Sequence, residues 1–122
     1  MDLQAKYVFI LNFIIAILFG LGFMFMPDIL MTMIGFSGEA DGPTAFRFFG
    51  IAIFGVSILC FLIRNEEPSN ARQAIIKTQV INFVLINVFL LIFGDLTNLM
   101  LWFTIFIHIL MIIAYGYILF KK

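Results

Sequence analysis

The sequence predicts an all-α integral membrane protein, an antiparallel up-down bundle of four transmembrane helices. Hydrophobic residues make up 64% of the 122 residues and charged residues only 11%, whereas soluble domains have about 45–50% and about 25%. Mean hydropathy is +1.17. The apolar residues fall into four runs of the length that a helix needs to cross a bilayer, about 20 residues. We therefore expect a single transmembrane domain over residues 1–122.

The breaks between the runs carry signals that end one helix and begin the next. Pro27 ends the first run, and residues 41–43 (Asp-Gly-Pro) predict a cap and a first-turn proline for the second. Residues 94–97 predict a tight turn between two antiparallel helices. Residues 27–36 are apolar but too short to cross, and predict a short helix or re-entrant piece at the interface, closed by Gly35. The predicted spans cover about residues 7–26, 44–63, 74–93 and 99–119.

Basic residues predict the orientation of the bundle. With four spans, all Lys and Arg residues except Arg47 fall at one end, and the opposite loops carry Asp and Glu but no Lys. Because basic residues gather on the cytoplasmic side, this bias predicts cytoplasmic N and C termini in the cell inner (plasma) membrane. The basic residues at the predicted cytoplasmic end are Lys6, Arg64, Arg72, Lys77, Lys121 and Lys122.

Several functional classes lack the residues that they need. A formal net charge of zero argues against a nucleic-acid surface. The single cysteine, Cys60, excludes paired-thiol chemistry within the chain. The membrane-embedded glutamate of small multidrug exporters has no counterpart, since the first span offers only Asn12. Hydrolase, protease and nucleotide-binding motifs are absent from the sequence. We expect no catalytic residues, no cofactor and no metal site.

Polar and small residues recur at helical spacing and predict the faces that point into the bundle. Small residues let helix backbones approach closely, which predicts packing positions at Ala16, Gly20, Gly50 and Gly55. The simplest interpretation of the polar residues is interhelical hydrogen bonding. The stripes predicted to face inward are Asn12, Ala16 and Phe19; Arg47, Gly50, Phe54 and Ser57; Gln79, Asn82 and Asn87; and Thr104, His108, Met111 and Tyr115.

Arg47 is the basic residue that breaks the charge pattern. It lies about one turn inside the second span between phenylalanines, where an unpaired charge costs a few kcal/mol unless it reaches the interface. One interpretation is an internal ion pair with Asp95 or Asp28, which belong to the same end. The other is a contact with an anionic headgroup, a carboxylate ligand or a quinone carbonyl.

His108 is the second candidate, near the middle of the fourth span. A haem or metal site would need more ligands than one histidine and the span interiors supply. A proton relay or a hydrogen bond to a ligand also remains open. The favoured interpretation is a histidine that is hydrogen-bonded to Asn87, at similar depth in the third span.

In layout the chain resembles small four-helix bacterial membrane families of the DoxX-like type. The resemblance covers most of the chain and depends on residues 26–36 (MPDILMTMIGF), on Arg47 and Gly50 at the start of the second span, and on Arg64 at its end. It implies the four-helix architecture and no reaction.

Two functional hypotheses follow. The first is a non-catalytic accessory or assembly subunit that packs against other membrane proteins, or against copies of itself, and against membrane lipids. The second is an intramembrane site for a quinone, lipid or other amphiphile around Arg47, Asn87 and His108, in a carrier or a redox-related enzyme. The first is favoured because catalytic groups are missing and packing-type glycines are present.

Overall fold

The computed structural model describes residues 2–36 and 42–121, which form five helices and no strand. Four helices are long and apolar enough to cross a membrane, and a fifth, short helix separates the first two. The predicted all-α bundle with a short helix after the first span is therefore confirmed. The helices are α1 (Leu3–Phe25), α2 (Pro27–Met33), α3 (Gly42–Ile63), α4 (Asn70–Phe93) and α5 (Leu99–Phe120).

Capping side chains, more than hydropathy, fix where the long helices begin. The Asp2 carboxylate caps α1, the Ser69 hydroxyl caps α4, and the Asn98 amide oxygen caps α5 by accepting backbone N–H groups of the first turn. As a result α1 and α4 begin four residues before the predicted spans, because their first turns are polar. The predicted cap of α3, Asp41, lies outside the described residues.

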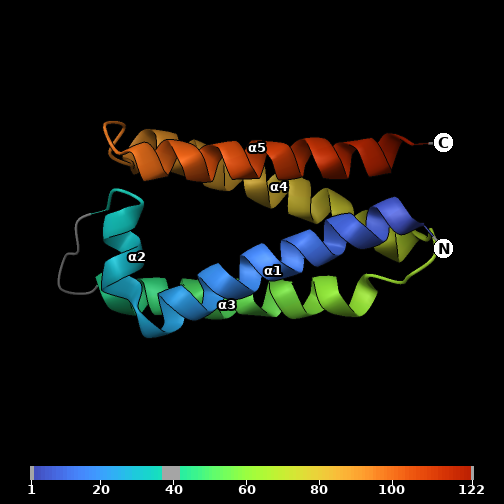
Figure 1. Cartoon of the computed structure of the whole chain (residues 1–122), viewed down its shortest axis with the longest axis horizontal. Helices are drawn as coiled ribbons and strands as arrows, with labels where there is room; N and C mark the ends of the chain where they lie inside the picture. The colour runs from blue at the N-terminus through green and yellow to red at the C-terminus, as the bar shows by residue number, and fades with distance from the viewer. Residues whose placement is uncertain (1, 37–41, 122) are drawn as a thin grey trace.

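The long helices are arranged as two antiparallel pairs. Helix α1 packs along α3, helix α4 packs along α5, and α1 also contacts α5. Figure 1 shows both ends of the chain at the same end of the bundle, as the topology predicts. The two pairs approach each other at that end, and their ribbons diverge toward α2.

Glycines determine how closely α1 and α3 cross. A Cβ atom on Gly20 would lie 2.9 Å from the backbone nitrogen of Phe54, and one on Gly50 would lie 2.8 Å from the carbonyl oxygen of Gly20. Ala16 is buried one turn before Gly20. These three predicted packing positions do lie in a helix interface. Gly55 does not pack against another helix in the described part of the chain, because a Cβ there would meet no atom within 4 Å.

Helix α2 links the far end of the α1–α3 pair to the α4–α5 turn. Pro27 occupies its first turn, where the missing N–H costs nothing. After the helix, Gly35 adopts a φ of 86°, which a residue with a side chain rarely does. A Cβ on Gly35 would lie 3.1 Å from the Cβ of Asp95, and Asn98 Nδ2 donates to the Thr32 carbonyl at 3.5 Å. Gly35 thus closes α2, as predicted.

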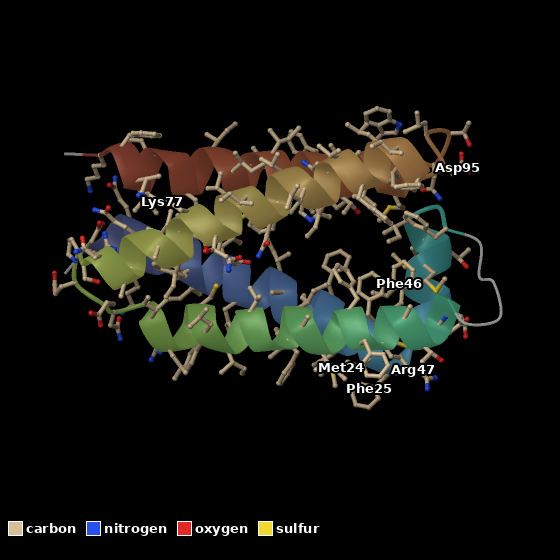
Figure 2. The ribbon with its side chains drawn as sticks, turned by 180° about the vertical axis from the view of Figure 1, so that it is seen from behind. Met24, Phe25, Phe46, Arg47, Lys77 and Asp95 are labelled. Carbon is tan, nitrogen blue, oxygen red and sulfur yellow. The ribbon has the colours of Figure 1, made fainter. Side chains whose placement is uncertain are left out.

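Aromatic rings occupy the space where the two pairs diverge. Phe36, just after α2, stacks on Phe89 of α4 at 5.8 Å and 15°, and its centroid lies 5.8 Å from that of Phe46 of α3. Phe46 in turn lies 5.4 Å from Phe23 of α1. Figure 2 shows Phe46 pointing between the pairs. These rings supply apolar contacts between the two pairs at the α2 end of the bundle, beside the hydrogen bond from Asn98 to Thr32.

Candidate functional site

A cluster of buried polar groups joins all four long helices, and we call it the polar node. Asn12 Nδ2 of α1 donates to the Tyr115 hydroxyl of α5 at 2.7 Å and to Gln79 Oε1 of α4 at 3.4 Å. Cys60 Sγ of α3 lies 3.8 Å from the same hydroxyl. None of the four residues is more than 4% exposed. Every long helix therefore contributes one side chain to a shared network.

The polar groups of the node are hydrogen-bonded to one another and packed against aromatic rings. The Tyr115 ring packs edge-on against Phe9, with centroids 5.6 Å apart, and against Phe83 at 6.5 Å. Buried polar groups in an apolar medium are costly unless they find partners, and here each finds one inside the chain. The node therefore orients and joins the helices. Its four side chains are buried and within hydrogen-bonding reach of one another.

The sequence indicated the members of the polar node but not their meeting. Asn12, Gln79 and Tyr115 were predicted on inward faces, whereas Cys60 was noted only for its inability to form a disulfide. Their position along the helices indicates that Asn12 and Gln79 lie at the same depth in the bundle. Each is the tenth residue of a helix that begins at the same end (12 − 3 + 1 and 79 − 70 + 1). Which of these groups bond depends on the rotation of each helix.

His108 and Asn87 form a second, partly buried polar contact, between α5 and α4. His108 Nδ1 and Asn87 Oδ1 share a hydrogen bond of 2.8 Å, and the imidazole lies 5.2 Å from the ring of Phe83. The predicted pairing of His108 with Asn87 is confirmed. Among the described residues, no three His, Cys, Asp or Glu side chains gather closely enough to hold a metal ion.

Arg47 lies apart from that pair. It is exposed on α3 and points away from the bundle, on the opposite side from Asp95 (Figure 2). No ion pair joins it to Asp28 or Asp95 in the part of the chain that the structure describes. Asp95 Oδ1 instead accepts from the Thr97 amide at 3.0 Å and hydroxyl at 2.6 Å, and these bonds lower the pKa of its carboxyl.

Two predictions about side-chain direction are therefore wrong. Arg47 and Asn82 face outward, although both were placed on inward stripes. The interior side of α4 carries Gln79 and Asn87, between which Asn82 lies on another face. Arg47 can keep its charge at the membrane surface because its long side chain reaches past the apolar residues. The proposed cluster of Arg47, Asn87 and His108 is not brought together.

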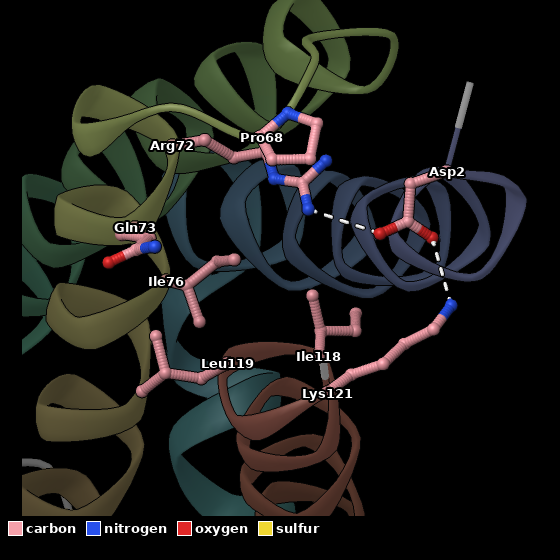
Figure 3. Close-up of a pocket in the computed structure, with 8 residues that line it drawn as sticks. All are labelled: Asp2, Pro68, Arg72, Gln73, Ile76, Ile118, Leu119 and Lys121. Carbon is pink, nitrogen blue, oxygen red and sulfur yellow. Dashed lines mark hydrogen bonds and ion pairs between the residues drawn. The ribbon is translucent and has the colours of Figure 1, made fainter.

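A group of charges at the other end of the bundle was not predicted as a site. Arg72 Nη2 lies 3.1 Å from Asp2 Oδ2, and Arg72 Nη1 donates to the Glu66 carbonyl at 3.0 Å. Lys121 Nζ lies 3.7 Å from Asp2 Oδ1 and also donates to Gln4. Figure 3 shows the Asp2 carboxylate between the two cations. Asp2 thus joins the starts of α1 and α4 to the end of α5.

Acid should weaken this ion group. The backbone N–H of Ala5, and then Arg72 and Lys121, lower the pKa of Asp2 despite its partial burial. A carboxyl with a lowered folded-state pKa stabilises the fold above its unfolded pKa of about 3.9, and this contribution is lost as pH falls through the folded value. We expect the difference in melting temperature between wild type and Asp2→Asn to shrink between about pH 5 and pH 3. A difference that stays constant over this range would contradict an ionic role for Asp2.

No protein-family model matches the chain, and neither a curated protein nor a solved structure is found to match it. The resemblance to DoxX-like families therefore stays a prediction.

Proposed function

We propose that this protein is a non-catalytic membrane subunit that acts by packing the outward face of α3 against another transmembrane helix. The observation that carries the proposal is Gly55. It lies at the centre of the exposed face of α3, beside exposed Ile51 and Ala52, and a Cβ there would meet open space. No contact among residues 2–36 and 42–121 explains why this position lacks a side chain.

A mid-helix glycine has a cost that some other contact must offset. Relative to alanine it destabilises a helix by about 1 kcal/mol. In membranes, small residues at helix surfaces let a second backbone approach closely, where dispersion and weak hydrogen bonds accumulate. Gly20 and Gly50 play this part within the chain. By the same reasoning, Gly55 suits the approach of a helix from outside, either a different protein or a second copy.

Arg47 supports the same face. It lies two turns before Gly55 on the exposed side of α3, and no described residue forms an ion pair with it. An arginine near the end of a span is stabilised by an anionic or carbonyl group, which a partner chain or a lipid headgroup can supply. The buried polar side chains support a structural role for the interior, since they are bonded to one another.

We also propose that the end of the bundle with both chain ends faces the cytoplasm, in the cell inner (plasma) membrane. The bias of Lys and Arg toward that end supports this orientation, because basic segments are retained on the cytoplasmic side. Labelling of Lys6 and Lys77 by an impermeant amine reagent should require broken cells. Equal labelling in intact cells would overturn the orientation.

Gly55→Leu tests the proposed subunit role. The leucine has room beside the described residues, so the variant should fold with at least the stability of the wild type and yet lose its partner from the native complex. Co-purification from mild detergent, followed by mass spectrometry and native gel analysis, measures this. Gly116→Leu is the matched control, because a Cβ at Gly116 also meets no atom within 4 Å but lies on α5. A wild-type chain that runs alone, or equal loss with both variants, would refute the proposal.

A further inference from the structure

A cavity of about 200 Å³ lies at the end of the bundle that holds the chain ends. Its apolar wall consists of Ile76 from the second turn of α4 and of Ile118 and Leu119 from the last turn of α5. Figure 3 shows these three side chains directed toward the same space. The apolar wall of the cavity thus belongs to α4 and α5.

Polar groups also line the cavity. They comprise the guanidinium of Arg72, the ammonium of Lys121, the amide of Gln73 and the carboxylate of Asp2. Two cations face one carboxylate, so these lining residues carry a formal charge of +1 (2 − 1). The net positive charge of these residues favours the binding of an anion.

One hydrogen-bond donor of the Arg72 guanidinium has no partner among the described residues. The residue is only 5% exposed, and its two terminal nitrogens are bonded to Asp2 and to the Glu66 carbonyl. Its Nε is buried and has no hydrogen-bond partner among the described residues. An unpaired donor on a buried charge is expensive, and an oxygen-rich anion is the group that a guanidinium binds best.

The position of the cavity matches the depth of lipid headgroups. Asp2 precedes α1, Arg72 belongs to the first turn of α4, and Lys121 follows α5, so all three lie at helix ends. The ends of membrane-spanning helices meet the polar headgroup layer, while the apolar wall continues toward the hydrocarbon. A ligand with a phosphate at one end and acyl chains at the other would satisfy both sides.

We propose that this cavity binds the phosphate of an anionic phospholipid from the leaflet at this end of the bundle. The phosphate lies against Lys121, Gln73 and Arg72, and the acyl chains follow the surfaces of α4 and α5. Basic pockets between transmembrane helices are suited to anionic headgroups, and each basic residue near the surface strengthens the attraction. The site is independent of the subunit role proposed for α3, and its test uses none of the same variants.

Asp2 makes the proposal testable in two directions. Its carboxylate already contacts both cations, so it competes with the incoming phosphate for them. Asp2→Asn removes this competition but keeps a residue that caps a helix well. Lys121→Gln removes a cation from an exposed position together with its ion pair to Asp2, and the glutamine amide can still donate a hydrogen bond. The first change should strengthen phospholipid binding and the second should weaken it, a reversal that simple loss of structure would not produce.

The experiment is a native mass spectrometry titration of the purified chain in neutral detergent with dioleoyl phosphatidylglycerol. We expect Lys121→Gln to weaken binding about fivefold and Asp2→Asn to strengthen it by a similar factor, the size of effect that one charge has near an anionic surface. Lys77→Gln is the matched control, because Lys77 belongs to α4 near the same end, is exposed and does not line the cavity.

Each alternative outcome overturns a stated part of the proposal. Equal affinity for phosphatidylcholine and phosphatidylglycerol, or equal weakening by Lys77→Gln and Lys121→Gln, would reduce the effect to non-specific attraction and refute the site. Displacement of the lipid by inorganic phosphate at comparable concentration would show a phosphate site and refute the phospholipid as its occupant. Weakening by both Asp2→Asn and Lys121→Gln would refute the competition between Asp2 and the headgroup.

Discussion

Replacing Gly50 by alanine should destabilise the fold by about 3 kcal/mol, at the upper end of what an added methyl group costs in a well-packed interior. The new Cβ would lie 2.8 Å from the Gly20 carbonyl oxygen, from the Met24 amide nitrogen and from the Cβ of Phe23. Two of these atoms belong to the α1 backbone and the third to the base of a side chain, so none can move alone. The helices α1 and α3 would have to separate.

Unfolding of the purified protein by SDS in mixed micelles, followed by circular dichroism, measures the loss. Gly55→Ala is the matched control on the same helix, because its Cβ meets open space. That variant should be neutral or slightly more stable, since alanine favours a helix over glycine. If both alanine variants unfolded at the same SDS fraction, the close crossing of α1 and α3 at Gly50 would be refuted.

Tyr115→Ala should cost about 2–3 kcal/mol, below the ~3–5 kcal/mol typical of large aromatic truncations in water-soluble cores. The side chain is completely buried and contacts Phe9 and Phe83, so its removal leaves a cavity. It also removes the acceptor of the 2.7 Å bond from Asn12. The cost is smaller than in water because detergent and lipid already surround the unfolded side chain with apolar groups.

Tyr115→Phe separates the packing of the ring from the hydrogen bond. It keeps the ring and removes only the hydroxyl, so we expect a loss of about 0.6–1 kcal/mol, the range of interhelical hydrogen bonds in membranes. In a double-mutant cycle, Asn12→Leu and Tyr115→Phe should be non-additive by a similar amount. Additive losses would mean that the two residues act independently, and the polar node would not be a network.

The four spans and their antiparallel order could be predicted because the bilayer imposes a length. A crossing helix needs about 20 apolar residues, and the runs of this length are separated by proline, glycine and charged residues. The turn before α5 and the short helix after α1 followed from the same signals, and Gly35 was correctly assigned to the end of α2. The starts of α1 and α4 were placed too late, because a hydropathy run does not include a polar, capped first turn.

The direction of individual side chains was predicted less well. In a soluble protein a polar residue marks the outside, but a membrane helix can carry polar residues either inside or near its ends. Asn82 and Arg47 were placed inward on this ground and face outward. Gly55 and Gly50 are both glycines within the same helix, but Gly50 packs against α1 whereas a Cβ at Gly55 would meet open space. Helix rotation, which depends on the partner surfaces, decides these cases.

The sequence by itself determined the class of protein, the number of spans and the pairing of His108 with Asn87. It also determined that the N and C termini lie at the same end of the bundle. Each follows from hydropathy, from charge, or from two polar groups at one depth. Only the tertiary structure decided that Asn12, Gln79, Cys60 and Tyr115 form one polar node, and that Asp2 lies between Arg72 and Lys121. The physical reason is that such contacts join residues far apart in the chain, so they depend on the rotation and axial offset of packed helices, which no local pattern encodes.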